Sequence, residues 1–421
     1  MSELIKVVDL QTIKTNPSGG QGKGSKPPKP ESHTQTKAPS MKAFLSLGFR
    51  PLYIGGVAWS LVSIALWIFT PELLDGPMWG VAWHAHEMLW GFVITIAVAF
   101  LLTASATWTG HNPMEGKALG WLVVAWIVAR VGYLIPADWA FYIAATAETI
   151  FFLFAAQRLM RVMMRSKNRR NDGLPFLVAG LGVINLLYLY EAYQDDYVAL
   201  IERFNLGLVG MAIVALLVAR RVLPFFAMRM VPGLEIPMLT RNGHIQLTIS
   251  TVAILLGLFG FEVWMGYLLG VIGLMALYQT IRWKPWMVLG KPMLWILYLG
   301  YGLMAIGLIV AGLQLTGHFW VMLDRPATFV HLIGMGGFGA LIIGMVTRTA
   351  LGHTGRPLKL DNSMLISYYL VLVAVVFRLW ALYPTEWYQT LLNISAATWI
   401  AGMALYLWRY VPLLIRPRPD K

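Results

Sequence analysis

Cysteine is absent from this chain of 421 residues. Disulfides, thiolate-held metals, cysteine nucleophiles and iron–sulfur clusters are therefore excluded, and any metal must be held by histidine, methionine, aspartate or glutamate. Charge is also scarce, because only 13% of the residues are charged, against about 25% in an ordinary soluble domain. Hydrophobic residues make up 58% of the chain, more than a water-soluble globule can bury. The lack of charge and the excess of hydrophobic residues indicate an integral membrane protein.

Alternation of apolar and polar residues, which marks the strands of a membrane barrel, is missing as well. The apolar residues lie in continuous segments of about 20, the length of helix that crosses a hydrocarbon core about 30 Å thick. Backbone groups in lipid must be paired within the chain, so such segments form helices. We therefore predict an all-α, polytopic helical bundle with about 12 transmembrane helices. The expected spans are 52–71, 84–106, 117–135, 138–160, 174–192, 198–221, 245–262, 264–281, 292–315, 327–347, 363–383 and 387–411.

Lysine and arginine gather in alternate loops, which assigns those loops to the cytoplasmic side of the membrane. This distribution explains the formal charge of +13 without a nucleic-acid partner, and none is expected. Both termini fall on the cytoplasmic side. The basic regions are residues 1–42, Lys117, 158–170, 220–241, 282–291, 348–359 and 409–421. The acidic residues of the opposite side are Glu72, Asp75, Asp138, Asp195, Asp196, Glu262, Asp324 and Glu386.

The N-terminal residues 1–42 lack the apolar core that a cleavable signal peptide needs. They are rich in glycine, proline, serine and lysine, and such a segment cannot bury enough apolar surface to order itself. We therefore predict a disordered cytoplasmic tail over residues 1–42, followed by a single twelve-span membrane domain over residues 43–421.

The histidines of the expected spans fall at two depths. His84, His86 and His331 lie where spans two and ten enter from the outer side. Residues two apart on a helix point about 200° apart, so His84 and His86 cannot both bind one iron on an unbroken helix. His84 and Glu87, three apart, share a face and could hold a divalent metal or handle protons. The inner level consists of His111, His244 and His353.

Two arginines lie inside spans at the same depth as the outer histidines. Arg130 and Arg378 each sit about five residues from the outer end of a span. A buried guanidinium group needs an anionic partner. Glu148 could pair with Arg130, but no comparable carboxylate is evident for Arg378. Haem would satisfy both arginines with its two propionates, and its iron takes axial histidines. The alternative is that these histidines are hydrogen-bonded groups at helix ends.

Four sequence runs carry a family resemblance. They are His84-Ala85-His86-Glu87-Met88, Trp108-Thr109-Gly110, Arg221-Val222-Leu223-Pro224-Phe225-Phe226 and Leu351-Gly352-His353-Thr354-Gly355-Arg356-Pro357. The chain after residue 45 resembles the NnrS family, which implies a bacterial inner-membrane protein associated with haem and copper in the nitric oxide and denitrification response. His111 departs from the family pattern, which argues against an inner metal site there. The matching positions are His84, His86, Glu87, His331, His353 and Arg356.

The resemblance and the residues together favour a haem-containing membrane oxidoreductase that binds nitric oxide and reduces or detoxifies it. Haem b is the expected cofactor, with copper or another second metal beside it, and electrons would come from a quinol or a separate carrier. The alternatives are a non-catalytic haem protein that senses or buffers nitric oxide, and a transporter of metal or a small anion. The oligomeric state stays open.

The expected roles divide among the residues named above. The glycine-rich run 334–339 is a candidate helix break, of the kind that transporters use. The expected haem ligands are His86 and His331, the second-centre or proton-handling residues are His84 and Glu87, and the propionate partners are Arg130 and Arg378. His353 and Arg356 are expected to bind a cofactor by resemblance alone.

Overall fold

A computed structural model of the chain describes residues 37–166, 171–318 and 325–419, and these contain helices but no strand. The first six predicted spans correspond to α2 (Phe49–Phe69), α3–η2–α4 (Gly80–His86, Glu87–Ile94, Thr95–Thr109), α5 (Gly116–Gly132), α6 (Asp138–Arg165), α7 (Leu174–Gln194) and α8 (Tyr197–Met230). The remaining six correspond to α9 (Thr240–Leu258), α10 (Glu262–Arg282), α11 (Pro292–Leu315), α12–η6–α13 (Ala327–His331, Leu332–Gly339, Ala340–His353), α14 (Asn362–Trp380) and α15 (Tyr388–Leu414). Shorter elements are α1 (Met41–Phe44), η1 (Pro71–Leu73) and η4 (Pro285–Val288).

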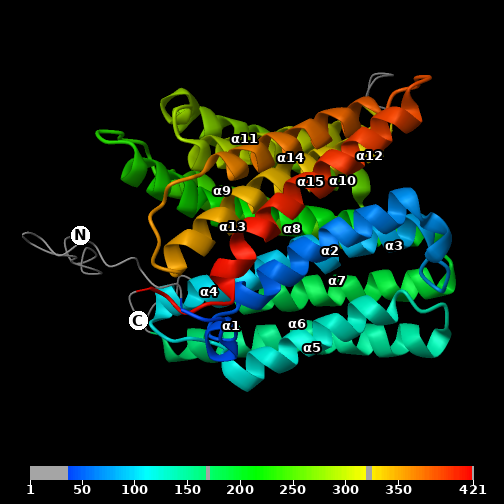
Figure 1. The fold of residues 1–421 in the computed structure, drawn as a ribbon. Coiled ribbons are helices and arrows are strands. Elements are labelled where there is room, and N and C mark those ends of the chain that lie inside the picture. Colours follow the sequence, from blue (N-terminus) through cyan, green and yellow to red (C-terminus); the bar gives the residue numbers. More distant parts are fainter. Residues whose placement is uncertain (1–36, 167–170, 319–324, 420–421) are drawn as a thin grey trace, which may run out of the picture. The chain divides into compact units, whose positions relative to one another are not determined.

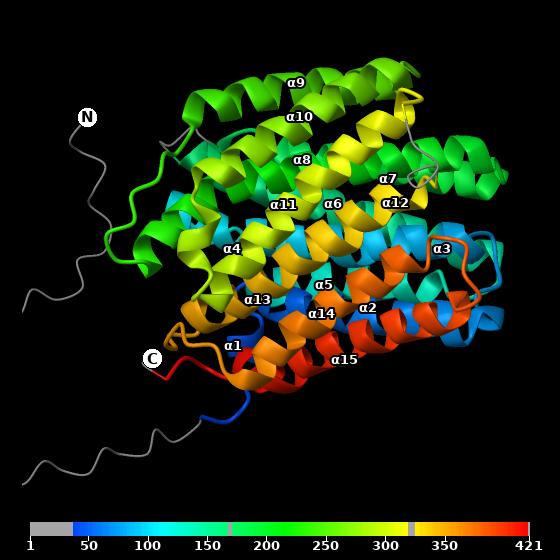
Figure 2. The same cartoon turned by 90° about the horizontal axis from the view of Figure 1, so that it is seen from above.

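Every predicted span therefore coincides with an observed helix, and the all-α membrane bundle is confirmed. Ten of these helices are long and apolar enough to cross a bilayer, within the part of the chain that the structure describes. The other two are α5, which has only 17 residues, and α9, which opens with polar side chains that include Asn242, His244 and Gln246. Figure 1 shows the long helices side by side, with α5 and α6 at one edge, and Figure 2 shows α9 and α15 at opposite edges.

The two ends of the described bundle meet at one side. The backbone N–H of Ser40 donates a hydrogen bond to the carbonyl of Ile415 over 2.9 Å. An even number of crossings is required to return the chain to the side where it began, in agreement with the predicted topology. Some residues named in the predictions lie outside the described residues. They are residues 1–36 of the predicted tail, Asp324 and part of the loop 158–170.

The second and tenth spans share an unusual backbone. Each is a continuous helix whose hydrogen bonding changes from α to π directly after a histidine, at Glu87 in one and at Leu332 in the other. Both are among the more buried spans. π segments inside α-helices are rare and frequently mark functional sites. The duplicated placement draws attention to His86 and His331, the residues that precede the two π segments.

The glycine run 334–339 is not a helix break. It forms the π segment η6, which continues directly into α13. A Cβ atom on Gly337 would lie 2.9 Å from Met304, and one on Gly339 would lie 3.0 Å from Trp399. The glycines therefore allow neighbouring spans to approach η6 closely, as small residues do in membrane bundles.

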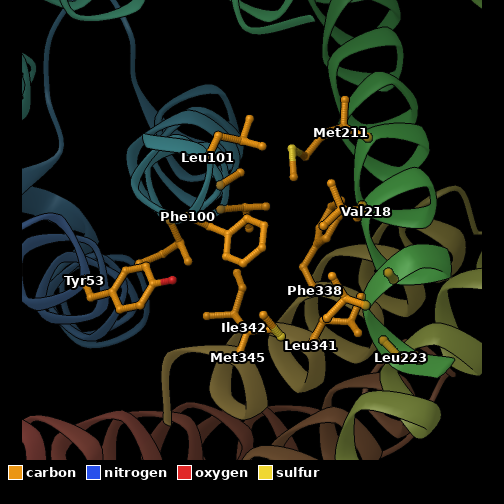
Figure 3. Close-up of a pocket in the computed structure, with 17 residues that line it drawn as sticks. Tyr53, Phe100, Leu101, Met211, Val218, Leu223, Phe338, Leu341, Ile342 and Met345 are labelled. Atoms are coloured by element: carbon orange, nitrogen blue, oxygen red, sulfur yellow. The ribbon is translucent and has the colours of Figure 1, made fainter. Parts of the chain in front are cut away.

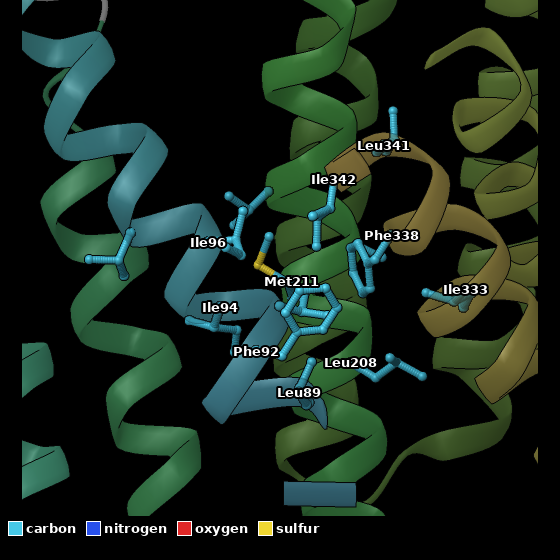
Figure 4. Packing of buried hydrophobic residues seen from close by; sticks show 14 of the residues in the cluster. Leu89, Phe92, Ile94, Ile96, Leu208, Met211, Ile333, Phe338, Leu341 and Ile342 are labelled. Atoms are coloured by element: carbon cyan, nitrogen blue, oxygen red, sulfur yellow. The ribbon is translucent and has the colours of Figure 1, made fainter. Parts of the chain in front are cut away.

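A layer of apolar side chains joins η2, α8 and η6 at the centre of the bundle. Figure 4 shows Leu89 and Phe92 from η2 near Leu208 of α8, with Ile333 and Phe338 of η6 beyond them, and all five are buried. Next to this layer lies a cavity of about 100 Å³ lined almost entirely by apolar side chains. Figure 3 shows Phe100, Met211, Phe338 and Ile342 around it, with Tyr53 at its edge.

Candidate functional site

His84 and His86 separate at the outer end of α3, as helical geometry predicts. The ring of His84 stacks on Trp67 of α2, with ring centroids 5.1 Å apart and an angle of 11°. The ring of His86 lies on the other side, against Trp90 and Tyr188. The two imidazoles therefore belong to two different polar centres, one on each side of α3.

The first centre is a buried ion cluster, which we define as His86, Glu87, Arg130 and Glu148. All four residues are at most 3% exposed. Arg130 bridges the two carboxylates, because its Nη1 donates to Glu87 Oε2 over 2.6 Å and its Nη2 donates to Glu148 Oε1. Trp59 Nε1 donates a further hydrogen bond to Glu87. The guanidinium group thus neutralises one of the two carboxylate charges.

His86 lies between the two carboxylates of the ion cluster. Its Nδ1 is 2.8 Å from Glu87 Oε1, and its Nε2 is 3.0 Å from both Glu148 Oε2 and the side-chain oxygen of Asn185. Both ring nitrogens therefore face acceptors, which suits an imidazolium that donates from each. A protonated His86 brings the cluster to zero net charge, and uncompensated charge is costly at membrane depth.

Glu148 receives two further hydrogen bonds that complete its shell. Tyr133 donates from its hydroxyl over 3.0 Å, and Asn185 donates from Nδ2 over 2.9 Å. Asn185 was not among the sequence-predicted site residues. It is a polar residue inside an otherwise apolar span, and this signal could have found it.

These contacts bear on three of the sequence expectations, which stay predictions. Both ring nitrogens of His86 lie beside carboxylate or amide oxygens, and the structure places His86 in a different centre from His331. Arg130 pairs with protein carboxylates, including Glu148, the partner named as the alternative to a propionate. Glu87 contacts His86, Arg130 and Trp59 and makes no contact with His84 within the described structure. The helix changes from α to π at Glu87.

The second centre consists of two histidines and an arginine: His84, His331 and Arg378. We call this centre the histidine pair, after its two imidazoles. His331 donates from Nδ1 to the carbonyl of Ala327 over 2.7 Å, and its Nε2 accepts a hydrogen bond from Arg378 Nε over 3.0 Å. The charge of Arg378 acts on both imidazoles. Two buried nitrogens of this centre, His84 Nδ1 and Arg378 Nη1, have no hydrogen-bond partner.

The donor set of the histidine pair fits haem better than a metal held by protein ligands alone. Within the described ranges, no three histidine, aspartate or glutamate side chains come together as metal ligands. Haem supplies four ligands of its own and needs only one or two imidazoles from the protein. The hydrogen bond from His331 Nδ1 leaves its Nε2 as the lone-pair nitrogen, the tautomer that binds iron. The unpartnered Nη1 of Arg378 suits a propionate.

His353 and Arg356 lie at the other end of the tenth span. At 1.5 Å per residue, the 22 residues between His331 and His353 span roughly 33 Å. The ring of His353 packs on Phe49 with centroids 5.5 Å apart. The structure thus keeps the two predicted histidine levels apart, and no centre joins them among the described residues.

Comparison with known proteins agrees with this architecture. The sequence pattern that defines the NnrS protein family matches residues 43–418, nearly the whole membrane domain. No curated protein sequence matches the chain. The chain therefore belongs to the NnrS family and is a multi-pass membrane protein of the nitric oxide response.

Proposed function

We propose that the protein binds haem b at the histidine pair and uses it to bind nitric oxide and reduce or detoxify it, in the bacterial inner membrane. The observation that carries the proposal is the hydrogen bond of Arg378 to His331, made by an arginine that has no carboxylate partner among the described residues, with His84 near enough for the arginine's charge to act on both imidazoles. Haem would supply the iron that binds the gas and exchanges electrons.

The residues of the pair would divide the work of holding haem. Ala327 fixes the tautomer and orientation of His331, which suits His331 as an axial ligand. His84 comes from α3 and offers a second imidazole. Arg378 would turn from His331 to a propionate, since it carries a positive charge that no described side chain neutralises.

The ion cluster would supply protons to the same reaction. Reduction of nitric oxide consumes protons as well as electrons, and His86 bears a proton between two carboxylates. His84 and His86 lie two residues apart, so the cluster and the histidine pair are separated by one helix. A quinol or a separate carrier would supply electrons, and a copper ion would need ligands beyond those that the described residues gather.

An optical spectrum of the purified protein, recorded with and without nitric oxide, tests the proposal. We expect a Soret band that shifts with the gas and that is lost in His331→Ala. The matched control is His111→Ala, which removes an exposed histidine outside the spans. Catalytic loss of nitric oxide with reductant would support an enzyme, whereas stoichiometric loss would indicate a haem protein that senses or buffers the gas. Purification without a Soret band would contradict both and favour a transporter.

A further inference from the structure

The inner ends of α2, α13 and α15 converge on a second charged region. Arg50, at the start of α2, donates from Nη1 to the carbonyls of Leu414 and Arg416 over 2.8 and 2.7 Å. These carbonyls belong to the end of α15, which has no further helical turn to satisfy them. Arg50 thereby ties the C-terminal segment to the first span.

We define the inner arginine cluster as Arg50, His353, Arg356 and Arg416. The charges of its members act on one another, since Arg50 acts on His353 and Arg416 acts on Arg356. Within the described ranges, Asp361 pairs with Arg409, and no member of the cluster forms an ion pair. The cluster therefore concentrates positive charge without enough carboxylate to balance it.

Several guanidinium groups of the cluster have unused donors. The Nε atoms of Arg50, Arg356 and Arg416 are buried, and none has a hydrogen-bond partner. Arg50 is 3% exposed. A buried donor without an acceptor loses its hydration and gains nothing in return. Burial, followed by the nearby charges of Arg409 and Arg416, also lowers the pKa of Arg356.

Topology alone does not account for this arrangement. Basic residues are expected on the cytoplasmic side of any polytopic protein. Lys284, Lys291 and Lys359 fit that expectation, because they lie on the same side and are exposed to solvent. Arg50 is instead almost fully buried and Arg356 and Arg416 are partly buried, and the Nε atom of each is buried without a hydrogen-bond partner.

We propose that the inner arginine cluster binds a phosphate group, and that an anionic phospholipid of the cytoplasmic leaflet supplies it. Guanidinium groups bind phosphate oxygens through paired N–H donors, and one phosphate accepts from several arginines at once. The cluster lies at the ends of spans, the depth at which headgroups lie. The proposal does not depend on haem binding at the outer end.

The test measures lipid binding to the full-length protein in neutral detergent by native mass spectrometry and by thermal unfolding. Phosphatidylglycerol is compared with phosphatidylethanolamine, whose phosphate carries no net headgroup charge, and with inorganic phosphate. We expect phosphatidylglycerol to bind and to raise the melting temperature. Arg356→Gln and Arg416→Gln should each weaken its binding by about fivefold. Lys359→Gln removes the same charge from the same loop as Arg356 and should change nothing.

Three results would overturn the proposal. Equal binding of the two lipids would show that charge is not recognised, and equal losses in Arg356→Gln and Lys359→Gln would show that the cluster is not the site. Protection by inorganic phosphate as strong as that by the lipid would assign the site to a soluble anion. The comparison of the two lipids uses the unmodified protein, so it stays valid even where a variant fails to fold. Arg356→Lys keeps the charge and should retain most of the lipid binding.

Discussion

Arg378 Nε lies 3.0 Å from His331 Nε2 and donates a hydrogen bond to it, although the two residues belong to different spans. His331 Nδ1 donates to a backbone carbonyl, so Nε2 is the acceptor. A guanidinium group held by a neutral imidazole keeps its full charge within the bundle, which is costly at membrane depth. The relationship explains why an anionic ligand, and not a protein carboxylate, completes the histidine pair in our proposal.

Arg378→Gln should therefore weaken haem binding. Losing a charged hydrogen-bond partner costs about 1.5–3 kcal/mol, which corresponds to roughly tenfold to a hundredfold weaker binding. Haem content per protein, measured from the reduced pyridine adduct, reports the change. Arg325→Gln is the control, because Arg325 is exposed just before the same span as His331. Equal haem content in the two variants would remove Arg378 from the cofactor site.

Arg130→Met should destabilise the protein strongly, because it leaves Glu87 and Glu148 buried without their shared cation. Breaking a buried ion pair costs about 3–5 kcal/mol. Thermal unfolding in detergent measures the loss. Adding Glu148→Leu to Arg130→Met should recover part of the stability, since the double variant removes one uncompensated charge.

The control for the ion cluster is Arg203→Gln, which breaks the longer pair of Arg203 with Glu191 at 3.7 Å, whose side chains are 24% and 15% exposed. A pair near the surface contributes about 0–1 kcal/mol. Melting temperatures that fall equally in Arg130→Met and Arg203→Gln would show that burial of the cluster does not matter for stability.

The sequence allowed the spans and the depth of the histidines to be predicted, because apolar length and helical rise depend on local chemistry alone. Partners across helices were harder to predict. The pairing of His86 with Glu148 depends on how α6 is rotated against α3, and no pattern within either helix encodes that rotation. The hydrogen bonds that Glu87 accepts from Trp59 and Arg130 also depend on neighbouring helices. His84 and His86 were correctly expected to diverge, since that follows from the helix itself.

The ion pair of Asp361 with Arg409 predicts a pH dependence outside the spans. Burial raises the pKa of Asp361, but hydrogen bonds from Ser363 and Arg409 outweigh it and hold the pKa below its usual value. A lowered folded-state pKa gives stability that is present above the unfolded-state pKa and is lost as the pH falls through the folded-state value. At pH about 7, Asp361→Asn should thus unfold at a slightly lower temperature than the unmodified protein. The loss in free energy of unfolding should be less than about 1 kcal/mol, because the pair is partly exposed.

The difference between Asp361→Asn and the unmodified protein should shrink as the pH falls below the usual aspartate pKa and through the lowered folded-state value, where the carboxylate takes up its proton. Asparagine caps a helix as well as aspartate does, so the hydrogen bond to the N–H of Met364 is kept and the comparison isolates the charge. A difference that grows in acid would contradict the lowered pKa.

Gly91 of the π segment η2 lies next to the side chains of the ion cluster. A Cβ atom there would lie 2.5 Å from Arg130 Nη1 and 2.7 Å from Glu87 Oε2. Gly91→Ala must therefore push the guanidinium group from its carboxylates, and overpacking of this kind costs about 1–3 kcal/mol. Gly180→Ala is the matched control, because Gly180 is also in a helix but has no atom within 4 Å of the added Cβ. That control should be neutral or stabilising by up to about 1 kcal/mol, since alanine favours the helix. If thermal unfolding shows Gly91→Ala to be as stable as Gly180→Ala, the close contact between the backbone and the ion cluster does not exist as described.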